Sequence, residues 1–87
     1  MIRMEAVYGC GDSMTPDVAA KLTAITEHYD ARLEMDHAGK RVLLDSLIGI
    51  LSMPCQRGDR LTILADEGEA GRAAAEAIAA VLEAKRG

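Results

Sequence analysis

The order in which strand-like and helix-like segments alternate along the chain constrains its fold more than any single motif. Short apolar or alternating runs indicate strands, whereas capping residues and apolar residues three or four apart indicate helices. Strands are expected at residues 2–8, 32–36, 41–44 and 60–65, and helices at 16–30, 47–53 and along an Ala-rich segment that runs to about Lys85. This β-α-β-β-α-β-α order predicts an α+β fold, an open-faced β-sandwich in which three helices cover one face of a four-stranded antiparallel sheet.

Residues that begin and end helices set these boundaries. Thr15 is a good N-cap, and Pro16 suits the first helical position, where a backbone N–H would have no partner. Ser46 can cap a short second helix, which Pro54 prevents from continuing. The apolar faces are expected to consist of Val18, Leu22, Ile25 and Tyr29 in the first helix and of Ala74, Ala77, Ile78, Val81 and Leu82 in the last.

The sequence contains no complete catalytic or metal-binding motif. The two histidines are expected on the surface, His28 at a helix end and His37 in the hairpin turn between the second and third strands. The cysteines Cys10 and Cys55 have no CxxC or Cys/His spacing, so no metal site is expected. No Ser/His/Asp set or glycine-rich phosphate loop can be assigned, and the sequence therefore predicts neither an enzyme nor a cofactor.

Length and charge narrow the class of protein further. The 87 residues are enough for one domain, 1–87, and too few for two. The formal net charge of −4 opposes binding to nucleic acid and to anionic membranes. The longest apolar stretch is interrupted by Asp45 and Ser46, and the first residues lack the apolar core of a signal peptide, so a cytoplasmic location is expected.

Several segments match successive parts of one known family. They are residues 19–22 in the first helix, 45–53 around the second helix, and 57–59, 61–63 and 67–69 around the fourth strand. Together they resemble the HPr family, the small phosphocarriers of the bacterial sugar phosphotransferase system. The resemblance covers nearly the whole chain and implies the same open-faced fold.

The chain departs from this family at the phosphocarrier motif, which runs Gly-Leu-His-x-Arg-Pro-Ala-Ala. The matching residues 13–20 read Ser-Met-Thr-Pro-Asp-Val-Ala-Ala. The resemblance therefore puts Thr15 at the position of the phosphorylated histidine and Asp17 at that of the arginine that helps hold the phosphate. Threonine cannot replace the labile phosphohistidine, and the Asp17 carboxylate would repel a phosphoryl group.

Ser46 matches the serine that an ATP-dependent HPr kinase phosphorylates in the family. A phosphate on an N-cap serine would lie at the positive end of a helix. Leu47, Ile48 and Leu51 resemble the apolar patch that family members offer to partners, and Asp45 stands where a basic residue is common. From the residues alone, Ser46 could be only a helix cap and the three aliphatic side chains only core.

The resemblance implies a change in electrostatic preference as well. Carriers of the family meet acidic partners through basic residues near the first helix, where Lys21 is the main basic residue left here. The corresponding region of this chain has acidic Asp12, Asp17, Glu27 and Asp45 and neutral Ala24 and Gly49. We therefore expect poor binding to the usual phosphotransferase enzymes.

Three functions remain open. The first is an HPr-like regulatory protein without the carrier histidine, resembling the catabolite-repression branch, whose serine-phosphorylated form binds a transcription regulator. The second is a diverged paralogue that acts as a plain protein-interaction module. The third is a phosphocarrier that uses another residue, such as Cys10 or His28.

The HPr fold would also bring the two cysteines to one end of the sheet. Cys10 follows the first strand and Cys55 precedes the fourth, and these strands are antiparallel neighbours in the family. The thiols could therefore form a redox-sensitive pair, or they could be two reduced structural cysteines.

Overall fold

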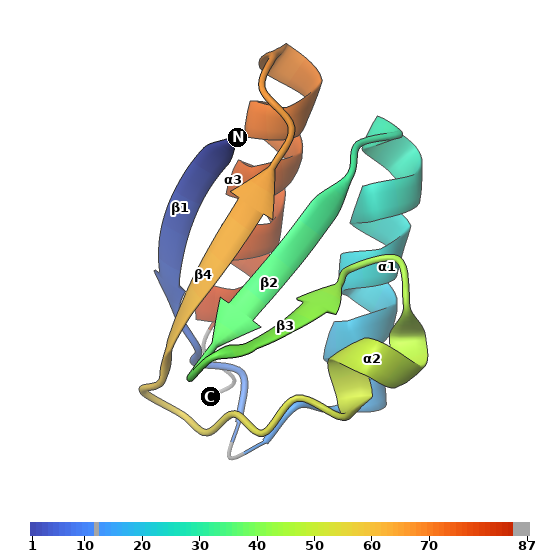
Figure 1. Cartoon of the computed structure of the whole chain (residues 1–87). Helices are drawn as coiled ribbons and strands as arrows, with labels where there is room; N and C mark the ends of the chain where they lie inside the picture. The colour runs from blue at the N-terminus through green and yellow to red at the C-terminus, as the bar shows by residue number, and fades with distance from the viewer. Residues whose placement is uncertain (12, 85–87) are drawn as a thin grey trace.

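The computed structural model describes residues 1–11 and 13–84, and it has the seven elements that the sequence predicts, in the predicted order (Figure 1). No boundary that lies within the described residues differs from its prediction by more than two residues, whereas the predicted helix end at Lys85 lies outside them. The elements are β1 (Ile2–Val7), α1 (Pro16–Tyr29), β2 (Leu33–His37), β3 (Lys40–Leu43), α2 (Leu47–Leu51), β4 (Arg60–Ala65) and α3 (Glu69–Glu83).

The four strands form one antiparallel sheet in the order β1-β4-β2-β3. The three helices lie on the same face of this sheet, with α3 over β1 and β4 and with α2 next to β3 (Figure 1). Ala38 and Gly39 form the β2–β3 turn with φ angles of 52° and 83°, a conformation that suits a two-residue hairpin. The predicted open-faced sandwich is therefore confirmed.

Both predicted helix caps are present. The Thr15 hydroxyl accepts a hydrogen bond from the Val18 N–H at 3.3 Å, and the Ser46 hydroxyl accepts one from the Gly49 N–H at 3.1 Å. Helix α2 ends at Leu51, earlier than predicted, because Ser52 already serves as its C-cap. The Ser52 hydroxyl donates to the Gly49 carbonyl at 2.7 Å, which satisfies one of the terminal carbonyl groups.

The core lies between the sheet and the helices, and the predicted apolar face of α1 was partly wrong. Ile25 and Tyr29 are only half-buried, and Thr26 is buried instead. A polar residue is tolerated there because the Thr26 hydroxyl reaches the carbonyl oxygens of Leu22 and Leu44, at 3.1 and 3.4 Å. The largest fully buried side chains are Tyr8, Val18, Leu22, Leu33, Met35, Leu44, Ile50, Leu61, Ile63, Ile78 and Leu82.

The predicted apolar face of α3 was also partly wrong. Ala74, Ile78 and Leu82 face the core as predicted, but Ala77 and Val81 are only half-buried. Gly71 and Ala75 complete the buried face in their place.

The first turn of α3 approaches the residue after β4 too closely for a side chain. A Cβ atom on Gly71 would collide with the carbonyl oxygen of Asp66, which is backbone and cannot rotate away.

We expect Gly71→Ala to destabilise the fold by about 2 kcal/mol or more, although alanine is the better helix former, because the helix would have to move off the sheet. Urea unfolding measures the difference. Gly11→Ala is the matched control, since a Cβ there would make only an ordinary contact with the Ser13 carbonyl oxygen at 3.9 Å. Equal losses in both variants would contradict the close approach at Gly71.

Candidate functional site

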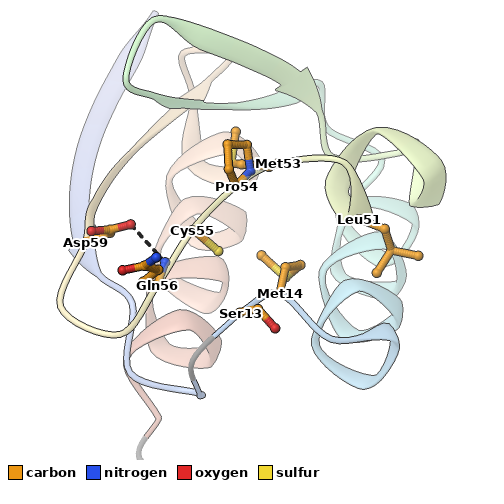
Figure 2. A pocket seen from close by; sticks show the side chains of 8 residues that line it. All are labelled: Ser13, Met14, Leu51, Met53, Pro54, Cys55, Gln56 and Asp59. Carbon is orange, nitrogen blue, oxygen red and sulfur yellow. Dashed lines mark hydrogen bonds between the residues drawn. The ribbon is translucent and has the colours of Figure 1, made fainter.

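The start of α1, the exposed side of α2 and the segment before β4 meet around a pocket of about 330 Å³ (Figure 2). Figure 2 shows Met14 and Cys55 directed toward one another across it, with Leu51 on the α2 side. The pocket is lined by Ser13, Met14, Leu51, Met53, Pro54, Cys55, Gln56 and Asp59. Apolar side chains thus form most of its wall, with polar groups from Ser13, Gln56 and Asp59.

Backbone hydrogen bonds fix the loops that form this site. The Tyr8 N–H donates to the Asp59 carbonyl, and the Gly58 N–H donates to the Tyr8 carbonyl, both at 2.8 Å. These bonds extend the β1–β4 pairing into the loops, so the loops that follow β1 and precede β4 lie at the same end of the sheet, as expected. The Tyr8 hydroxyl also donates to the Ser13 carbonyl at 2.6 Å and anchors the approach to α1.

Thr15 and Asp17 lie at the start of α1. The Thr15 side chain is occupied as the N-cap, and Asp17 is an exposed carboxylate in the first turn. A carboxylate there interacts favourably with the positive end of the helix dipole. The structure therefore gives both residues a role in stabilising α1.

Ser46 is half-buried at the start of α2, with its hydroxyl held toward the helix. Gly49 makes room for this hydroxyl, because a Cβ at that position would lie 3.1 Å from the Ser46 Oγ. Lys40 lies at the opposite end of α2, where its Nζ donates to the Ser52 carbonyl at 3.0 Å.

Three of the four aliphatic side chains of α2 are exposed to solvent. Leu47 is 44% exposed, Ile48 82% and Leu51 40%, whereas Ile50 of the same helix is fully buried. The sequence left open whether the three were core residues, and their exposure excludes that reading. They form a contiguous turn of one helix, which we call the α2 patch.

Cys10 and Cys55 are both buried, and the structure holds them as two thiols rather than as a disulfide. The Cys10 Sγ–H donates to the Val81 carbonyl at 2.9 Å and lies 3.4 Å from the Leu82 carbonyl, so it caps the last turn of α3. Burial raises the pKa of the Cys55 thiol, the Asp59 carboxylate and Cys10 raise it further, and a hydrogen bond from the Met14 backbone opposes them.

Asp59 organises the segment before β4 in a way that the sequence analysis missed. Its carboxylate accepts a hydrogen bond from the Gln56 N–H at 2.8 Å and lies 3.2 Å from the His37 Nε2. The His37 Nδ1 lies 3.2 Å from the Arg60 carbonyl. The expectation of an ordinary surface histidine in a turn was therefore wrong for His37, which ends β2 with a side chain only 17% exposed.

His28 is exposed in the last turn of α1, at the opposite end from Thr15, with its ring edge-on to Tyr29. Among residues 1–11 and 13–84, no cluster of three or more His, Cys, Asp or Glu side chains could hold a metal ion. Over the same part of the chain, no helix is long and apolar enough to cross a bilayer.

A comparison with protein families shows to which family the chain belongs. The family described as "PTS HPr component phosphorylation site" matches residues 14–84, which include Thr15, Asp17 and Ser46. The chain therefore belongs to the HPr family of the phosphotransferase system. No curated protein sequence matches it significantly.

Solved structures of this family share the fold. HPr-C-His from Thermoanaerobacter tengcongensis superposes with a TM-score of 0.82 at 19% identity, covering 95% of this chain and 92% of that protein. The phosphocarrier protein HPr from Bacillus anthracis gives 0.81 at 25% identity, covering 93% and 95%. The Bacillus subtilis catabolite-repression protein Crh, described as an intertwined dimer with a swapping domain, gives 0.74 at 21% identity, covering 99% and 98%.

The raised pKa of Cys55 should make its thiol slow to react with iodoacetamide, since only the thiolate is the nucleophile. In a Cys10→Ser variant, Cys55 is the one remaining thiol, and its alkylation rate is measured against pH. We expect the midpoint, the pH at which this rate is half-maximal, to be higher in the folded protein than in denaturant. Asp59→Asn should lower this midpoint only partly, because burial is the larger cause. Asp66→Asn, at the other end of β4, is the control, and an unchanged midpoint on unfolding would contradict the assignment.

Disulfide formation between Cys10 and Cys55 stays a prediction. It would remove the thiol donor that caps α3, and it would require Cys10 to turn away from the Val81 carbonyl. Counting of accessible thiols in denaturant, before and after mild oxidation with oxidised glutathione, tests it. Loss of both thiols in the monomer, with no glutathione mass added to the chain, would support a redox pair, and retention of two thiols would leave them as structural cysteines.

Proposed function

We propose that this HPr-family protein is a regulatory member of the phosphotransferase system that does not carry phosphate and is controlled by phosphorylation at Ser46. The main observation in favour is the contrast between the two helix caps. Thr15, at the position that corresponds to the carrier histidine by resemblance, has no imidazole. Ser46, at the position of the regulatory serine, retains its hydroxyl beside an exposed aliphatic patch.

Loss of carrier activity follows from the chemistry around Thr15. A carrier needs a nucleophile whose phosphorylated form is labile, with positive charge nearby to hold the phosphate. The Thr15 hydroxyl accepts a backbone hydrogen bond, and the nearest charge in the first turn is the carboxylate of Asp17. A phosphothreonine ester would transfer its phosphate poorly.

The other candidate carriers are poorly placed. The Cys10 thiol is buried and donates to a helix-terminal carbonyl, where a thiolate would be repelled. His28 is exposed, but it lies more than three turns further along α1 than Thr15, about 20 Å away. Neither residue therefore offers a replacement for the family's histidine at the start of α1.

Regulation through Ser46 is supported by its position as the N-cap of α2, directly before the exposed aliphatic residues of the α2 patch. A phosphate would add about 1.5 to 2 negative charges next to Leu47 and Ile48. A partner that contacts the α2 patch would therefore sense the modification directly. An HPr kinase and a phospho-dependent transcription regulator are the partners that the family resemblance implies.

Without phosphorylation, the same surface would make the protein a plain interaction module. This second candidate rests on the exposure of Leu47, Ile48 and Leu51, which needs no modification. In that case Ser46 would act only as the cap of α2, a role that is worth about 1 kcal/mol.

Intact mass spectrometry after incubation with ATP and an HPr kinase distinguishes the two candidates. We expect one phosphate on the wild type, none on Ser46→Ala, and one on the matched control Ser52→Ala, whose hydroxyl lies in the same helical turn as Gly49. Incubation with phosphoenolpyruvate and the first enzyme of the system should leave the wild type unmodified. Phosphorylation in that second reaction would instead establish a carrier.

A further inference from the structure

We propose that the exposed sides of α1 and α2 form a docking surface for a basic protein segment, in which an apolar side chain packs on the α2 patch and lysine or arginine side chains pair with surrounding carboxylates. This inference rests on the proposed function as a partner-binding regulator, and it names the chemical class of the partner. Three observations carry it: the exposure of the aliphatic residues, the shape of α1 beside them, and the sign of the charge around them.

The α2 patch is the most exposed aliphatic surface among the helices that the structure describes. Ile48 alone is 82% exposed, and no element of the described chain covers it. Exposed aliphatic groups that lie together on one short helix favour contact with another protein. The pocket beside Leu51 continues this apolar surface toward Met14 and Met53, and it could accept the end of an aliphatic side chain.

Helix α1 packs beside α2 and presents a flat stripe to solvent. Four exposed residues recur along it at spacings of three or four, and the two in the middle are alanines. Small side chains there would allow the backbone of a partner to come close. The stripe consists of Asp17, Ala20, Ala24 and Glu27.

The charge around this surface selects a basic partner. Asp17 and Glu27 lie at the two ends of the stripe, and the exposed Asp45 lies just before α2. Lys21 lies one turn after Asp17 on α1, on the flank that faces Val81 of α3, and the Lys40 Nζ is held at the Ser52 carbonyl. The carboxylates that this surface offers to a partner are therefore Glu27 and Asp45.

The same charges disfavour two other occupants. A second copy of this chain would bring its own carboxylates to the contact, and an anionic lipid surface would be repelled. Phosphorylation of Ser46 would instead increase the negative charge between the α2 patch and Asp45. It would therefore strengthen the binding of a basic segment, which gives the proposed modification a direct effect on affinity.

The test uses two fluorescent synthetic peptides of matched amphipathic sequence. Each has leucines along one helical face, and the flanking charges are Lys/Arg in one peptide and Asp/Glu in the other. Fluorescence anisotropy with the full unmodified chain should show that the basic peptide binds at least about tenfold more tightly and that salt weakens its binding. Ile48→Ala should weaken it about five- to tenfold.

Charge-reversal variants locate the interaction. Glu27→Lys combined with Asp45→Lys should abolish or invert the preference for the basic peptide. Glu5→Lys combined with Glu76→Lys makes the same change in net charge on β1 and α3, and it should leave a preference for the basic peptide. Thermal unfolding of each variant separates a loss of binding from a loss of folding.

Equal binding of the two peptides, preference for the acidic one, binding of neither, or equal effects of the two double variants would overturn the proposal. The outcome is independent of the kinase experiment, because no phosphate is involved. Binding of the basic peptide to a chain that the kinase never modifies would keep the surface and refute regulation at Ser46. Modification of Ser46 together with a preference for the acidic peptide would keep the regulation and refute the partner class.

Discussion

Hydrogen bonds from Tyr8, Gly9 and Cys10 hold together the sheet, the loop before β4 and the end of α3, on which the site depends. Tyr8 pairs with Gly58 and Asp59 in the loop before β4, while the Gly9 N–H donates to the Leu82 carbonyl at 2.8 Å. Gly9 can approach so closely because it has no side chain, since a Cβ would lie 3.3 Å from the Glu83 carbonyl oxygen. The end of α3 and the loop that leads to α1 are therefore fixed relative to the sheet by one short segment.

This arrangement explains why Cys10 has a structural role whatever its redox behaviour. The last carbonyl groups of a helix have no partner within the helix, and a buried end needs donors from elsewhere. The N–H of Gly9 and the thiol of Cys10 supply them to Leu82 and Val81. The Cys10 thiol therefore helps to hold the end of α3 against the segment that follows β1.

The sequence was sufficient for helix caps, which depend on neighbouring residues, and insufficient for contacts that depend on how the elements pack. The caps Thr15 and Ser46 could be predicted because each hydroxyl bonds a backbone N–H three residues later. The contact of His37 with Asp59 joins residues that are far apart in the chain. The need for glycine at position 71 involves Asp66, which is close in sequence, but it depends on how the turn after β4 places α3 against the sheet. Periodicity also misjudged α1, because Thr26 satisfies its hydroxyl within the core and so can replace an apolar residue there.

The side chains at the start of α1 have a common chemical character that bears on function. The Thr15 hydroxyl is engaged as an acceptor, Cys55 keeps its proton because of burial and the nearby Asp59, and Asp17 adds another carboxylate. Transfer of a phosphoryl group between proteins requires the opposite, a free nucleophile in a positive field. The proposed recognition of a basic segment has no such requirement, because it uses an apolar anchor and surrounding carboxylates. The surface on α1 and α2 is thus better suited to recognition than to transfer, and a phosphate on Ser46 would add to the charge that such recognition uses.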